Sequence, residues 1–374
     1  MTLVARIMIG GAPFLIADAL ISSGDLSNSY ITGIECELPL IGEINSLLAA
    51  KERPFRVDLC QKLHVFEGRL AVGWSANDAM QAERALKVLR EVAKKPDVTF
   101  ADVQDELSAI DPDQINGLSL VGNLLQAVSG NQINSSIFGL NAITEDIAGF
   151  GNVQTAGSGA RTFIQMLRQN EPPPRSSAND PWTALAILGT LLNQEITTGQ
   201  SIDERWGGAF ETVSFSRHTG RLEKLDNVLH TFWSWRGDGK LDFQPRFYLA
   251  RYHDGLLMLR STEYEAGENH SIKRLISNKL QLVPSLLRPV RPDDRLKIGH
   301  VDFSHDHVCC HVWFPRASGS ATPEAALVLA GPRGSLYDIN LSVAEDGSLN
   351  LQLPGETVTN VFEAAKATAD KLTS

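Results

Sequence analysis

Between residues 300 and 311 the sequence gathers side chains that bind metal ions in other proteins. They are His300, Asp302, His305, Asp306, His307, Cys309, Cys310 and His311. On an extended strand, His305, His307, Cys309 and His311 would all point to one side. Because His-x-His pairs chelate zinc, this segment is a candidate metal site. The chain has no second group with metal-like spacing, however, and the residues around His305 also fit a polar hairpin turn. We therefore favour neutral histidines in a solvated turn and predict neither a metal nor another cofactor.

A second candidate for chemistry is a pair of opposite charges, Asp18 and Lys62. Asp18 interrupts an otherwise apolar segment, residues 13–20. A buried carboxylate is costly unless it is paired, and Lys62 is its natural partner. Taken alone, these two residues indicate a structural ion pair.

Two hairpins must carry this pair. Residues 3–20 form two nearly continuous apolar strands around Gly10-Gly11, a turn that tolerates positive φ. Residues 62–74 form a second hairpin, which turns at Glu67-Gly68. Because strands this apolar are covered on both faces, we expect further layers on each side of them.

Helices and further strands follow the hairpins. Ser75 is the expected N-cap of a helix that ends at Lys94-Lys95-Pro96, and Asp180 the expected cap of a helix that begins at Pro181. This order fits two sheets with helices on both outer faces, a four-layer αββα sandwich of the α+β class. The remaining elements are expected as helices over 101–109 and 160–169, and strands over 118–125, 137–140 and 209–217.

The composition of the chain changes after about residue 225. Turn signals at Asp254-Gly255 and Asp346-Gly347 predict two more hairpins, and a final amphipathic helix is expected over about 356–372. We therefore divide the chain into a core of residues 2–225 and a β-rich C-terminal extension of residues 226–374.

Charge and composition exclude several classes of function. The 374 residues carry 34 Lys+Arg against 44 Asp+Glu, a net charge of −10, which argues against nucleic acid or an anionic membrane as the main partner. The four cysteines are too few for a disulfide framework, so a reducing cytoplasmic location is expected. Residues 3–21 are apolar, but Arg6, Asp18 and the glycine pair interrupt them and no basic region precedes them, which disfavours a signal peptide.

Four segments, in order, resemble a known family. They are TLVARIMIGGAPFLIADALIS (2–22), QKLHVFEGRLAVGWSANDA (61–79), AGSGA (156–160) and SIDERWGGAF (201–210). These segments resemble the N-terminal-nucleophile hydrolases, specifically the proteasome β-type threonine peptidases, over residues 2–220. The resemblance implies the same four-layer fold and an amide-bond hydrolase.

The resemblance also implies a role for the charged pair. Thr2, once Met1 is removed, would supply both the nucleophilic hydroxyl and, through its α-amine, the base. Lys62 would lower the pKa of that amine, and Asp18 would orient Lys62.

Further site residues follow from the same resemblance. Ser158 and Asp203 would hydrogen-bond near the amine, and the backbone N–H of Ala76 would donate to the oxyanion. Ala76 stands where the family usually has Gly, and Trp206 where it usually has Ser. An insertion after Asp18, helix-like over 40–51, would restrict the cleft. The substrate pocket would be lined by Ser22, His64, Trp74 and Asp78.

We therefore expect a threonine hydrolase that cleaves a peptide or another amide. The alternative is a catalytically silent scaffold or regulatory subunit. A homo-oligomer and an ATP-dependent unfoldase partner are both compatible with the resemblance, although no sequence feature indicates the unfoldase. Neither nucleic acid nor membrane is expected as a partner.

Overall fold

The structure, a computed structural model, is mixed α+β, as the sequence predicts. None of the helices in the described part of the chain is both long and apolar enough to cross a membrane. Met1, the expected cap at Asp180, His300 and the Asp346-Gly347 turn lie outside the described residues, as does most of the stretch 40–51. The described residues are 2–9, 11–23, 37–38, 42–43, 56–129, 132–169, 181–266, 272–297, 304–315, 323–343 and 349–373.

The predicted N-terminal hairpin forms the centre of a six-stranded sheet. Strand β1 (Val4–Ile9) pairs antiparallel with β2 (Ala12–Asp18), and Gly11 has the positive φ of +83° that the turn requires. The strand order is β11-β12-β1-β2-β13-β14. The other four strands are β11 (Ile143–Ile147), β12 (Gly151–Ala156), β13 (Phe210–Ser216) and β14 (Arg221–Lys224).

The second predicted hairpin belongs to a four-stranded sheet. Strands β7 (Leu63–Phe66) and β8 (Leu70–Ala76) turn at Glu67 and Gly68, which have φ values of 53° and 65°. The order β10-β9-β8-β7 is completed by β9 (Leu118–Ser129) and β10 (Gln132–Leu140), both longer than predicted. One buried cluster contains side chains of both sheets, including Val4, Leu63 and Val121, so the two sheets pack face to face.

Helices α2 (Ala79–Ala93) and α3 (Phe100–Ser108) pack on the four-stranded sheet. The predicted N-cap at Ser75 is wrong: strand β8 continues to Ala76, and Asp78 caps α2 by accepting from the Met80 N–H. A 3-10 turn at Pro112–Gln114 follows.

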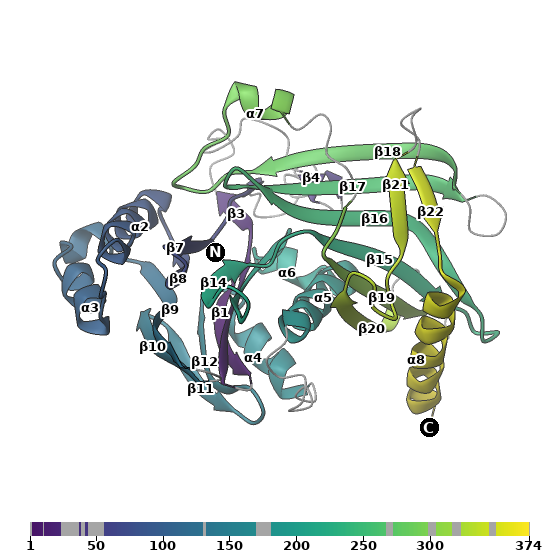
Figure 1. Ribbon diagram of the computed structural model, residues 1–374, viewed down its shortest axis with the longest axis horizontal. Coiled ribbons are helices and arrows are strands. Elements are labelled where there is room, and N and C mark those ends of the chain that lie inside the picture. The colour runs from purple at the N-terminus through teal and green to yellow at the C-terminus, as the bar shows by residue number, and fades with distance from the viewer. Residues whose placement is uncertain are drawn as a thin grey trace.

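Other helices pack on the opposite face of the six-stranded sheet. They are α4 (Ala160–Gln169), α5 (Pro181–Thr198) and the short α6 (Gln200–Asp203). Figure 1 shows the sequence of layers from α2 and α3 at the left, through the two sheets, to α4 and α5 near the middle.

A third sheet lies beyond α5, with the order β18-β17-β16-β15-β19-β20. All of its pairs are antiparallel except β15 with β19, which are parallel. The predicted hairpin at Asp254-Gly255 is confirmed, with φ values of 47° and 77°. Its strands are β15 (Val228–Trp235), β16 (Leu241–His253), β17 (Leu256–Ala266), β18 (Ile272–Val283), β19 (His307–Pro315) and β20 (Pro323–Pro332).

Smaller elements complete the chain. The final helix α8 (Gly355–Thr373) packs on the face of the third sheet away from α5, as Figure 1 shows at the right. Gly42–Glu43 is a strand, so the helix-like pattern predicted over 40–51 is wrong at that point. The short elements are β3 (Leu20–Ser23) paired with β6 (Arg56–Leu59), β4 (Glu37–Leu38) with β5 (Gly42–Glu43), β21 (Asn340–Val343) with β22 (Leu349–Gln352), and α7 (Pro292–Lys297).

The third sheet shares a hydrophobic core with the rest of the protein. Phe232 and Tyr248 of this sheet belong to the same buried cluster as Phe14, Leu188 and Phe210. The division at residue 225 stays a prediction.

Candidate functional site

Asp18, at the end of β2, is the centre of a buried hydrogen-bonded group. Its side chain is fully buried. Oδ1 accepts from the Thr2 hydroxyl at 2.5 Å, the Lys62 ammonium at 2.7 Å and the Leu3 N–H at 2.8 Å. Oδ2 accepts from the Gly207 N–H at 2.7 Å. Four donors from three distant segments therefore fix this carboxylate.

Lys62 reaches Asp18 from the position directly before β7. Its ammonium is fully buried and also donates to the Leu20 carbonyl. Burial lowers the pKa of Lys62, while the Asp18 carboxylate opposes that shift. The Lys62 backbone N–H donates to Glu211 Oε2 at 2.6 Å, so a second buried carboxylate holds the start of the strand.

Thr2 lies against the loop that follows β12. The side chain is 2% exposed, and the Thr2 carbonyl accepts from the Gly159 N–H at 3.1 Å. Gly157 has a φ of +92°, and a Cβ there would lie 2.0 Å from the Thr2 carbonyl oxygen. Only glycine fits at this position, because any side chain would displace the backbone of Thr2.

Ser158 belongs to the loop that contacts Thr2, and Asp203 belongs to the short helix α6. The Ser158 hydroxyl donates to the Glu204 carbonyl at 2.9 Å, and Asp203 is exposed at the end of α6. The Trp206 indole is fully buried and donates to Glu204 Oε2 at 2.9 Å. The structure thus joins Thr2, Asp18 and Lys62 in one hydrogen-bonded group, and the roles of Ser158 and Asp203 in proton transfer stay predictions.

The residues predicted to line a substrate pocket come from β3, β7, β8 and the start of α2. Trp74 is 3% exposed and packs in the cluster under α2. Burial lowers the pKa of His64 to about 3, so its ring is neutral. Asp78 caps α2, and the half-buried Ser22 belongs to β3.

Ala76, the predicted oxyanion donor, is the last residue of β8 and pairs with Leu118 of β9. The functions of Ala76 and of the pocket residues stay predictions.

Two buried carboxyl groups beside the hydrogen-bonded group of Thr2, Asp18 and Lys62 were not predicted from the sequence. Glu195 of α5 is 2% exposed and accepts from the Gly208 N–H at 2.6 Å. Burial raises the pKa of Glu195 to about 8, so it is largely protonated at neutral pH. Glu211 accepts from Lys224 at 2.8 Å and from the Tyr252 hydroxyl at 2.9 Å. For Glu195, the only signal in the sequence is a glutamate within an apolar helix pattern, and that signal does not identify its hydrogen-bond partner.

The predicted solvated turn is wrong, because His307, Cys309 and His311 lie on strand β19, and His305 and His311 are buried. The histidines divide into separate environments. His305 contacts Asp338 at 2.6 Å, and the His307 ring packs edge-on against Trp182. Cys309 and His311 instead lie beside His230 of β15, which the sequence did not connect with them.

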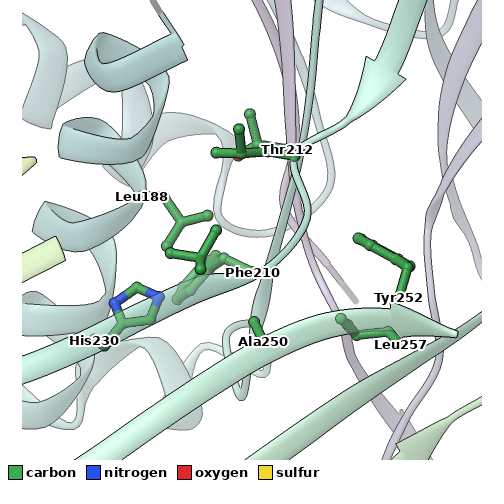
Figure 2. Close-up of a pocket in the computed structure, with 9 residues that line it drawn as sticks. Leu188, Phe210, Thr212, His230, Ala250, Tyr252 and Leu257 are labelled. Carbon is green, nitrogen blue, oxygen red and sulfur yellow. The ribbon is translucent and has the colours of Figure 1, made fainter. Parts of the chain in front are cut away.

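A small cavity lies between α5, β13 and the third sheet (Figure 2). Its volume is about 10 Å³, enough for roughly one water molecule. Thr212 and His230 line it together with apolar side chains, and the Thr212 hydroxyl has no hydrogen-bond partner among the described residues. The cavity is too small to bind an organic substrate.

The sequence matches no protein-family model and no curated protein. Solved structures that it resembles include a Gly-1 mutant of Anbu from Hyphomicrobium sp. strain MC1, at 12% identity and a TM-score of 0.36, over 60% of this chain and 86% of that one. Anbu from Yersinia bercovieri, described as an ancestral β-subunit, is 11% identical with a TM-score of 0.34, over 59% and 86%. Anbu from the same Hyphomicrobium strain is 10% identical with a TM-score of 0.36, over 59% and 86%. A likeness at this level carries no inference about activity or assembly.

The family assignment made from the sequence is therefore wrong. No family model supports membership of the proteasome β-type threonine peptidases, and the solved structures carry the name Anbu instead. The four matching segments are short, and the local backbone conformation alone accounts for some of their residues. Gly157 and Gly207, for example, have φ values of +92° and +108°, which favour glycine in any family. The homo-oligomer and the cytoplasmic location stay predictions.

Proposed function

We propose that this chain hydrolyses amide bonds, with Thr2 as the nucleophile once the peptide bond before Thr2 has been cleaved. The observation that carries the proposal is the contact of the Thr2 hydroxyl and the Lys62 ammonium with the same oxygen of Asp18, at 2.5 and 2.7 Å. Burying an ammonium or a carboxylate is costly unless the charge is paired and hydrogen-bonded, and here the two charged groups and the hydroxyl satisfy one another.

The proposed reaction uses the free α-amine of Thr2 as its base. The amine accepts the hydroxyl proton as Thr2 Oγ1 attacks the amide carbonyl, and then gives a proton to the leaving nitrogen. The resulting ester on Thr2 is hydrolysed by water, which restores the hydroxyl. Lys62 keeps the amine neutral by charge repulsion, and Asp18 holds both the ammonium and the hydroxyl in position.

Other residues support this chemistry in the proposal. The Ala76 N–H stabilises the oxyanion, Ser158 and Asp203 help to transfer the proton, and residues 22, 64, 74 and 78 line the pocket. We also propose that the core is a four-layer αββα sandwich. The cluster shared by the two sheets and the helices packed on their outer faces support this arrangement.

One observation favours a second candidate function. Thr2 is 2% exposed, so a substrate could not reach its hydroxyl while the residues around it remain as they are. A catalytically silent scaffold would retain the Asp18–Lys62 pair for stability alone.

Hydrolysis and the mass of the mature chain test the proposal together. Protein from the natural host should begin at Thr2, as seen by intact mass spectrometry, and should cleave at least one member of a panel of fluorogenic peptide amides. Thr2→Val, which keeps the shape but removes the hydroxyl, should abolish cleavage, whereas Thr2→Ser should retain part of it. Undiminished cleavage by Thr2→Val would assign the activity to another residue. No cleavage by correctly processed protein would favour the scaffold.

A further inference from the structure

Three side chains able to bind a metal ion converge on the face of the third sheet that α5 covers. His230 lies on β15, and Cys309 and His311 lie on β19. One nitrogen from each ring and the Cys309 Sγ all lie within 4.8 Å of one another. All three side chains are at most 1% exposed.

Strand pairing brings these residues together. Strands β15 and β19 run parallel, with His230 opposite Cys309 and Phe232 opposite His311. Helix α5 crosses this face closely: a Cβ at Gly189 would lie 2.9 Å from Cys309 Sγ. The glycine therefore lets the backbone of α5 approach the sulfur more closely than a residue with a side chain would allow.

Hydrogen bonds around Asn193 fix which nitrogen of His311 has a free lone pair. The Trp313 indole N–H can only donate, and it lies 3.0 Å from Asn193 Oδ1, which sets the orientation of the amide. His311 Nδ1 lies 3.0 Å from the same oxygen and must therefore carry a hydrogen. In the neutral ring, Nε2 then has the lone pair, and it faces His230 Nδ1 at 2.9 Å. A second ring nitrogen anchored by an oxygen is typical of histidines that bind metals.

The charge of the cluster selects the kind of ion. Imidazole coordinates a metal ion as the neutral ring, so the two histidines add no charge to the site. Among the described residues, no carboxylate belongs to the cluster. With a thiolate at Cys309, a monovalent ion gives a neutral complex, whereas a divalent ion leaves a buried positive charge, which is costly. Soft thiolate and imidazole ligands favour Cu(I) among monovalent ions.

We propose that His230, Cys309 and His311 form a three-coordinate Cu(I) site in the interior of the protein. Binding forms one Cu–S and two Cu–N bonds. The thiol proton of Cys309 leaves to solvent, and the proton between the two rings moves to Nε2 of His230. No electron is transferred, and the site does not depend on Thr2 or on the proposed hydrolysis.

Copper content and ligand identity test this proposal. Full-length protein, produced in copper-supplemented medium and purified anaerobically, should retain one copper per chain by mass spectrometry of the metal. X-ray absorption should show one sulfur and two nitrogen ligands and an edge typical of Cu(I). Cys309→Ser should reduce the copper to roughly a tenth of a copper per chain or less, because the thiolate supplies the charge.

Cys310→Ser is the matched control. Cys310 is the adjacent buried cysteine, but its sulfur faces the other side of the sheet, with Thr231 and the Tyr337 carbonyl. This variant should retain one copper per chain.

If neither copper nor zinc is retained by the wild type, the cluster is only a hydrogen-bonded histidine pair and the proposal is wrong. Binding of zinc in preference to copper would overturn the choice of a monovalent ion. Ligands other than one sulfur and two nitrogens in the wild-type spectrum would overturn the site itself, and this result does not depend on whether the serine variant folds.

Discussion

Asp18 is the residue on which the candidate site depends. It accepts from a hydroxyl, an ammonium and two backbone N–H groups, and none of these donors lies next to it in the chain. Because every partner is buried, the loss of one charge leaves the other without compensation. The group therefore contributes to stability whether or not it is catalytic.

A double-mutant cycle measures the coupling between Asp18 and Lys62. Asp18→Asn and Lys62→Met should each lower the free energy of unfolding by about 3–5 kcal/mol, because each leaves a buried group unpaired. The double variant should lose less than the sum, by about 1–3 kcal/mol. Urea unfolding measures all three. Lys87→Met, which breaks an exposed pair with Glu83, is the control and should cost about 0.5 kcal/mol or less. Strict additivity would mean that the two residues do not interact.

Glu195 should make stability depend on pH in the neutral range. Its pKa rises from 4.5 in the unfolded chain to about 8 in the folded protein. Between these values the folded state holds a proton that the unfolded state has released, so stability falls as pH rises through the interval. Each pKa unit is equivalent to about 1.4 kcal/mol.

Glu195→Gln, which resembles the protonated acid, tests this dependence. Relative to wild type, the variant should be about equally stable at pH 5 and clearly more stable at pH 9, as measured by urea unfolding at each pH. Glu363→Gln, on the exposed side of α8, is the control and should follow the wild-type profile. A constant difference between Glu195→Gln and wild type at all pH values would show that Glu195 titrates normally.

The sequence identified some of these residues but not others. Asp18 and Lys62 could be paired because a carboxylate in an apolar strand must find a cation. Glu195 and Glu211 could not be placed. Each accepts from a backbone N–H, of Gly208 and Lys62 respectively, which carries no signal in the sequence, and the side-chain partners of Glu211 include Tyr252 of the distant strand β16.

The loop between β12 and α4 is the element that holds Thr2 in place. Gly157→Ala should destabilise the protein by about 3 kcal/mol or more, since it combines a left-handed φ with a clash against the Thr2 carbonyl. Gly220→Ala is the matched control, because Gly220 has a φ of +68° but open space around it, and it should cost only about 1–2 kcal/mol. Thermal or urea unfolding compares the two. Equal costs would show that the loop moves away from Thr2 freely.

Local elements were predicted better than the pairing between them. Both N-terminal hairpins and the hairpin at Asp254-Gly255 have the predicted turns, because their glycines and short connections define them locally. The start of α2 was misplaced because β8 extends to Ala76 by pairing with β9, a partner distant in the chain. For the same reason the histidines of β19 were grouped along their own strand, although His311 contacts His230 of β15.

The third sheet is joined to the rest of the molecule by buried polar and apolar contacts. Tyr252 donates to Glu211 at 2.9 Å, and Gln61 donates to the Val283 carbonyl at 2.8 Å. Phe232 and Tyr248 pack in the core that contains Phe210. Glu211 also holds Lys62, so the third sheet supports the candidate site indirectly.

We therefore predict that the whole chain unfolds in one step. Circular dichroism and tryptophan fluorescence should give the same denaturation midpoint, because the two parts share one core. A fragment of residues 2–225 should be insoluble or partly folded, because the loss of the third sheet would expose Phe210 and Leu188. Two separate transitions, or a compact soluble fragment, would show that the parts are independent.

The central claim is that Thr2 reacts through both its hydroxyl and its own amine. A graded series of peptide epoxyketones tests this directly, because such a compound forms a ring with an adjacent hydroxyl and amine and adds its full mass. Mass spectrometry of the N-terminal peptide should show this adduct on Thr2 in the wild type and none in Thr2→Ala. The adduct should persist in Cys60→Ser, which removes the free buried thiol two residues before Lys62 as an alternative target. Failure of every compound to modify protein that begins at Thr2, or an adduct that persists in Thr2→Ala, would contradict the claim.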